Sequence, residues 1–145
     1  SLVGSEMCIR DSNIGALATA LADPVNPVTA QYHLAFVASD TFYEHTHRYP
    51  GQRHDWQADV DPLLSHAQTY CARIGLDLSD SDRVRLQHAC YELTRGAHSD
   101  TPSTAAYLGG VAAQEVIKIL TVQYIPLDNT CVYDGIVQAV SSFRL

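Results

Sequence analysis

Apolar residues recur at helical spacing along the first two-thirds of the chain. Three amphipathic helices are predicted, over residues 28–46, 62–74 and 79–96, because one face of each repeats with a period near 3.6 residues. The apolar positions of the first helix are Tyr32, Phe36, Val37, Phe42 and Tyr43. The sequence "RYPG" ends this helix, and the polar stretch 52–61 that follows is predicted to be a loop.

Residues at the ends of the second and third helices suit those positions. Pro62 fits a first helical turn, and the nearby carboxylates of Asp59 and Asp61 favour the positive end of the helix dipole. Gly75 is expected to cap the end of the second helix, and Ser79 is among several side chains that could cap the start of the third.

A fourth helix is predicted from Pro102 to about Val122, with Thr101 as its cap. Between residues 105 and 113 it is apolar nearly all round, which predicts burial rather than a surface position.

Two adjacent glycines, Gly109 and Gly110, lie inside this predicted helix. Together they cost about 2 kcal/mol relative to alanine. A phosphate loop is disfavoured because the GxGxxG spacing is missing, no strand precedes the pair, and amides within a helix are already bonded. We therefore expect the glycines to let another backbone approach closely.

The spacing of apolar residues no longer follows a helical period after the fourth helix. The runs "YIPLDN", "TCVYDG" and "VQAVSSFRL" are rich in β-branched and aromatic residues, and the turn dipeptides Asp128-Asn129 and Asp134-Gly135 separate them. The predicted fold class is α+β, a fragment of an α/β fold in which a buried helix and a short antiparallel strand set follow a three-helix portion.

The expected organisation has three parts. Residues 13–98 form a helical insert portion, and residues 99–145 form a carboxyl-terminal helix with strands. Residues 1–12 fit neither pattern and are predicted to be a non-native leader.

Composition excludes several classes of function. The 145 residues carry a net charge of −7 without any run of Lys or Arg, so nucleic acid is not an expected partner. The sequence has no apolar stretch near the roughly 20 residues that a bilayer requires, so we expect a soluble protein without a membrane partner.

The four cysteines, Cys8, Cys71, Cys90 and Cys131, form no CxxC pair. They are expected to be reduced and mostly buried, which suits the cytosol or nucleus. The seven histidines lack the close pairing of zinc ligands, and no GxSxG nucleophile motif occurs. We therefore assign no catalytic, cofactor-binding or metal-binding residue.

Two stretches resemble one enzyme superfamily. The segment "TAAYLGGVAAQEVIKILTVQYIPLDNTCVYDG" resembles the end of the adenylation fold in enzymes that activate ubiquitin and its relatives, the ThiF-type superfamily. Upstream, "FYEHTHRYPG" is similar to the turn before their helical insert, so the resemblance covers about residues 32–145. The "SSFRL" ending looks most like the regulatory subunit of the neddylation-activating enzyme, and the chain is expected to be a carboxyl-terminal fragment of it.

This resemblance implies a non-catalytic subunit that scaffolds a catalytic partner in a heterodimer. The partner would hold ATP, magnesium and the ubiquitin-like modifier, and would form the thioester, so this chain would bind no cofactor. Cytoplasmic and nuclear localisation would follow. The residues that match the motif, and so would serve packing, are Tyr107, Gly109, Gly110, Ala113, Gln114, Asp134 and Gly135.

Three alternatives remain open at the level of sequence. The chain could be the truncated first half of a single-chain ubiquitin-activating enzyme, or a regulatory subunit of the sumoylation pathway. It could also be a helical interaction domain unrelated to modifier activation. Because a lone strand pair is marginal in water, we expect the isolated fragment to be poorly stable.

Overall fold

The structure is a computed structural model that describes residues 14–22, 27–99, 101–127 and 130–144. Within these ranges it is mostly helical with one small sheet, which confirms the α+β class. The helices and strands, in chain order, are α2 (Ile14–Leu21), α3 (Pro27–Thr46), the 3-10 helix η1 (Trp56–Asp59), α4 (Val60–Ile74), α5 (Asp80–Arg95), α6 (Pro102–Thr121), β1 (Thr130–Asp134) and β2 (Ala139–Phe143).

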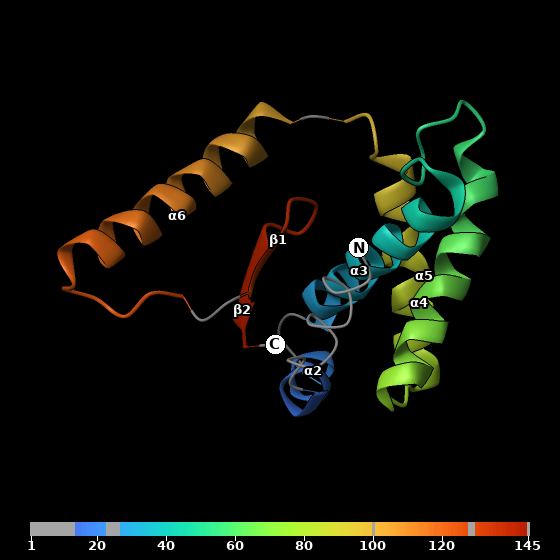
Figure 1. The fold of residues 1–145 in the computed structure, drawn as a ribbon, viewed down its shortest axis with the longest axis horizontal. Coiled ribbons are helices and arrows are strands. Elements are labelled where there is room, and N and C mark those ends of the chain that lie inside the picture. Colours follow the sequence, from blue (N-terminus) through green and yellow to red (C-terminus); the bar gives the residue numbers. More distant parts are fainter. Residues whose placement is uncertain (1–13, 23–26, 100, 128–129, 145) are drawn as a thin grey trace.

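Helix α3 is the centre of the helical bundle. It packs against both α4 and α5, and α2 lies across its amino-terminal part (Figure 1). The largest side chains at the centre of the core are Leu17, Leu34, Phe42, Leu63 and Leu86, each at most 2% exposed. The three helices predicted from apolar periodicity are confirmed as helices. The aromatic face predicted for the first one is only partly correct, because Phe36 is 53% exposed and Tyr43 43%, and the face of α3 that meets the core is lined mainly by alanines and Leu34.

Two of the predicted caps are confirmed, whereas Thr101 precedes α6 without a side-chain capping hydrogen bond. The Ser79 hydroxyl accepts a hydrogen bond from the Asp82 N–H, and the Asp82 carboxylate accepts from the Ser79 N–H, so the two form a capping box at the start of α5. Gly75 closes α4 in the left-handed conformation, with φ of 73°.

The prediction of a loop over residues 52–61 is wrong in its second half. Residues 56–59 form η1, and α4 begins at Val60, two residues before Pro62. A proline this early in a helix removes an N–H that would have no partner within the helix, so it does not break α4.

The sheet is a single antiparallel hairpin. Thr130 pairs with Phe143 at the open end, and Asp134 pairs with Ala139 next to the turn. The Asp134 Oδ1 accepts hydrogen bonds from the Ile136 and Val137 amides, which closes the predicted turn. Strand β1 packs against α3, which places the hairpin beside the bundle.

A further strand in "YIPLDN" is not observed. The described residues 122–127 are irregular, and Asp128-Asn129 lie outside the described residues. Pro126 has no N–H to give to a ladder, and the Leu127 N–H donates instead to the Glu115 carboxylate, at 2.7 Å.

Helix α6 extends away from the bundle on the far side of the hairpin (Figure 1). None of its residues is buried, so the prediction of a buried fourth helix is wrong for the described chain. The hairpin covers only part of one side of α6, and the described residues offer no second apolar surface to cover the rest. The predicted leader, residues 1–12, lies outside the described residues.

Candidate functional site

The motif-bearing helix α6 contacts the hairpin near its start and the segment before the hairpin nearer its end. Near its start, the rings of Tyr107 and Tyr133 pack together with centroids 4.6 Å apart. Near its end, the Glu115 carboxylate accepts a hydrogen bond from the Lys118 Nζ at 2.7 Å as well as one from the Leu127 N–H. An open hollow of about 300 Å³ lies between α6, the segment before the hairpin and the start of β1.

The predicted packing residues fall into two groups. Tyr107, Asp134 and Gly135 lie where the hairpin approaches α6: the Tyr107 ring packs on Tyr133, the neighbour of Asp134, and a Cβ added at Gly135 would lie 3.3 Å from the Thr104 hydroxyl.

Gly109 and Gly110 form the second group with Ala113 and Gln114, and all four are exposed. A Cβ added at either glycine would meet no atom within 4 Å in the described chain. Their role in close packing therefore stays a prediction.

Large, exposed apolar side chains occur along the distal half of α6 and the segment after it. Ile119 is 62% exposed, Leu120 76%, Val122 87% and Ile125 91%. Monomeric proteins rarely leave such large neighbouring side chains in water, and patches of this kind mark contact surfaces. We call residues 107–127 with the hairpin the assembly face.

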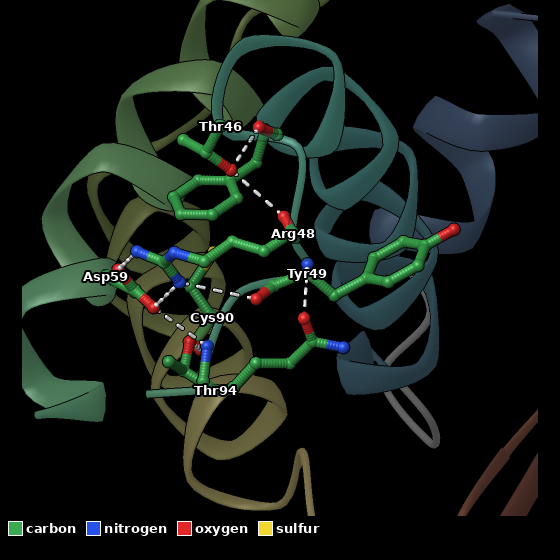
Figure 2. Close-up of polar contacts among 9 residues, drawn as sticks. Thr46, Arg48, Tyr49, Asp59, Cys90 and Thr94 are labelled. Carbon is green, nitrogen blue, oxygen red and sulfur yellow. Dashed lines mark hydrogen bonds and ion pairs between the residues drawn. The ribbon is translucent and has the colours of Figure 1, made fainter. Parts of the chain in front are cut away.

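A second feature, the turn between α3 and η1, was only partly anticipated from the sequence. Arg48 donates two hydrogen bonds to the Asp59 carboxylate, from Nη1 at 2.5 Å and from Nη2 at 2.6 Å (Figure 2). Asp59 is 4% exposed, and its Oδ2 also accepts the Gly51 N–H at 2.9 Å. The Arg48 guanidinium lies 5.2 Å from the centroid of the Phe42 ring. The carboxylate thus fastens the "RYPG" turn to the bundle.

The electrostatics of this turn follow from its geometry. The hydrogen bonds from Arg48, followed by the one from the Gly51 amide, lower the pKa of the Asp59 carboxyl despite its burial. The sequence predicted Asp59 only as a charge near a helix start, because its pairing with Arg48 depends on the path of the chain through η1.

Gly51 permits this close arrangement. Its φ is 82°, and an added Cβ would lie 2.1 Å from the Thr94 carbonyl oxygen. Thr94 is itself fixed, because its hydroxyl donates to the Cys90 carbonyl at 2.6 Å (Figure 2).

Burial governs the chemistry of the two cysteines in the bundle. It raises the pKa of Cys71 to about 11 and the pKa of Cys90 to about 12, so both are protonated thiols near neutral pH. The prediction that these thiols are buried is confirmed, and Cys131 is half-buried. Cys8 lies outside the described residues.

Two searches of the described residues gave no site. In this part of the chain, no group of three or more His, Cys, Asp or Glu residues is arranged to hold a metal ion. No helix among them combines the length and the apolar character needed to cross a bilayer.

Comparison with known proteins finds regulatory subunits of one class of enzyme. The chain is 32% identical over 114 residues to the NEDD8-activating enzyme E1 regulatory subunit of Gallus gallus, covering 78% of this chain and 20% of that protein. It is 33% identical over 114 residues to the Drosophila melanogaster protein of the same description, covering 79% and 21%. The regulatory subunit AXR1 of Arabidopsis thaliana is 27% identical over 127 residues, covering 88% and 23%.

These similarities make the chain a homologue of the regulatory subunits of the E1 activating-enzyme superfamily. Within that class, the relatives named here are subunits of the NEDD8-activating enzyme, which confirms the resemblance inferred from the motifs. A weaker similarity, 29% over 116 residues, reaches ubiquitin-activating enzyme E1 1 of Schizosaccharomyces pombe. The sumoylation alternative gains no support from these relatives.

Two facts bound the comparison. The chain spans about a fifth of the length of the curated regulatory subunits that it matches. No family model matches it.

Proposed function

We propose that this chain is part of the non-catalytic regulatory subunit of a NEDD8-activating enzyme. In this role it would scaffold the catalytic subunit, which would bind ATP and magnesium, adenylate the modifier and form its thioester in the cytoplasm and nucleus. The observation that carries the proposal is the similarity to regulatory subunits over about four-fifths of the chain. The protonated, buried state of Cys71 and Cys90 supports a role without a thiol nucleophile.

The assembly face suggests how the scaffold is built. Its exposed apolar side chains, together with the open space beside Gly109 and Gly110, fit a helix that another backbone covers closely. We propose that the remaining part of the adenylation fold packs on this face and that β1 and β2 extend its sheet. The free energy of covering the apolar surface would offset the cost of the two glycines.

Co-purification tests the proposal. The full-length protein, expressed with a NEDD8-activating catalytic subunit, is expected to elute with it as a stable heterodimer. A stable, folded monomer that never pairs would contradict the scaffold role.

A matched pair of variants tests the assembly face. Gly110→Leu is expected to disrupt folding or pairing, because it fills the space that the covering backbone needs. Gln87→Leu adds the same side chain at an exposed position of α5 and is expected to pair normally. Equal pairing of the two variants would count against the assembly face.

A further inference from the structure

A cleft on the helical bundle lies beside the hairpin, because Phe36 and Leu93, which line it, also line the hollow between the bundle and the hairpin turn. It has a volume of about 440 Å³ and is formed by α3, the turn after it, and the end of α5. This volume lies in the lower part of the range for ligand pockets, about 300–1,000 Å³. The residues that define its chemistry are His33, Phe36, Asp40, Tyr49, Leu93 and Ala97.

The walls of the cleft are aromatic and apolar. Phe36 and Tyr49 remain 53% and 47% exposed, although both are large apolar rings. Phe36 and Asp40 are four residues apart on α3, so they lie on the same face of the helix. An aromatic wall beside a carboxylate on one helix face suits a ligand with an apolar stem and a positive end.

Asp40 supplies the only full charge among the lining residues near neutral pH. Burial lowers the pKa of the other titratable lining group, His33, which favours its neutral form. In the described chain, the Asp40 carboxylate has no ion pair and no hydrogen bond, in contrast to Asp59 and Glu115, whose charges are matched. The cleft therefore carries a negative charge that is free to pair with a cationic ligand.

The wall opposite α3 is held in place before any ligand arrives. The Tyr49 ring packs on the Tyr43 ring with centroids 4.8 Å apart, and the Tyr49 N–H donates to the Gln52 side chain at 3.1 Å. Arg48, the neighbour of Tyr49, is fixed by Asp59, and the Tyr49 ring lies on the opposite side of the turn from that carboxylate (Figure 2). A preorganised wall reduces the entropy lost on binding.

We propose that this cleft binds a lysine or arginine side chain of a partner polypeptide, with Asp40 pairing with the cation and Phe36 and Tyr49 flanking its apolar stem. The volume leaves room for an apolar neighbour of the basic residue. The peptide titration below reads out this cleft and co-purification reads out pairing with the catalytic subunit, so failure of this proposal can be distinguished from failure of the scaffold role.

A peptide titration of the full-length protein tests the proposal. The probes are acetyl-Leu-Lys-Leu-amide and its neutral counterpart acetyl-Leu-norleucine-Leu-amide, with dissociation constants measured by NMR chemical-shift titration. The lysine peptide is expected to bind about three- to fivefold more tightly, as an exposed carboxylate contributes up to about 1 kcal/mol to such a pair. Equal affinities, or no binding of the lysine peptide at millimolar concentration, would overturn the proposal.

Two carboxylate variants locate the effect. Asp40→Asn is expected to abolish the preference for the lysine peptide, whereas Glu44→Gln, one helical turn away and outside the cleft, should leave it unchanged. A preference that persists in Asp40→Asn, or one lost equally in both variants, would refute the assignment. Raising the salt concentration should weaken binding of the lysine peptide and leave binding of the norleucine peptide unchanged, because salt screens the ion pair with Asp40.

Discussion

Replacing Arg48 by methionine isolates the energetic role of the turn after α3. The substitution keeps an unbranched side chain and removes the guanidinium that donates two hydrogen bonds to Asp59. The carboxylate, 4% exposed, would keep only the Gly51 amide as a donor. Breaking a buried ion pair by removing one partner costs about 3–5 kcal/mol.

The loss should appear as local opening of the turn. In the full-length protein, hydrogen exchange followed by mass spectrometry reports the protection of backbone amides in residues 48–60. A loss of about 3 kcal/mol corresponds to protection lower by roughly a hundredfold, since 1.4 kcal/mol is about a factor of ten. The Gly51 amide should lose protection along with its neighbours.

The matched control is Arg53→Met, five residues along the chain. Arg53 is exposed and has no ion pair in the described chain, so its replacement should change protection by less than about threefold. Combining Arg48→Met with Asp59→Asn should cost less than the sum of the two single changes, by at least about 1 kcal/mol. Equal protection in Arg48→Met and Arg53→Met would refute this account of the turn.

Three further predictions follow from the same structure. Folding lowers the pKa of the Asp59 carboxyl. The stability that the ionised carboxylate contributes should therefore be complete above its pKa in the unfolded chain, about 4, and should be lost as the pH falls through its lower pKa in the folded chain. An acid titration of turn protection should therefore show a loss below about pH 4 that is absent in Asp59→Asn. Gly51→Ala should lower the melting temperature of the bundle far more than Gly75→Ala. Both glycines have a positive φ, but only at Gly51 would the new Cβ collide with another atom, the Thr94 carbonyl oxygen. Equal losses of melting temperature would contradict this. In the isolated chain, we expect no cooperative thermal transition above about 60 °C by circular dichroism, because the assembly face is uncovered.

Apolar periodicity predicted the elements whose burial partners lie within the chain. The faces of α4 and α5 could be read from the sequence because each meets the bundle core, and the capping residues Ser79 and Gly75 act locally. The face of α3 was predicted only in part, because its aromatic residues Phe36 and Tyr43 are exposed and small residues take their place in the core. Helix α6 was assigned correctly, but its burial was not, because burial depends on a surface that the described chain does not provide.

Pairings between distant residues were harder to predict. The ion pair between Arg48 and Asp59 forms because η1 brings the Asp59 carboxylate back to the turn. No local sequence pattern predicts this path of the chain. The strand expected in residues 124–129 does not form in its described part, because Pro126 has no N–H and the Leu127 N–H is bonded to the Glu115 carboxylate. The motif in α6 pointed to the superfamily more directly than any structural feature did.

The most direct test of the central claim follows the modifier itself. Full-length protein, its catalytic subunit, ATP and fluorescent NEDD8 are mixed, and the products are separated on a non-reducing gel. The scaffold account predicts that the labelled thioester migrates with the catalytic subunit alone and forms only when the regulatory protein is present. A labelled thioester on the regulatory chain, or equally fast formation without that chain, would contradict it.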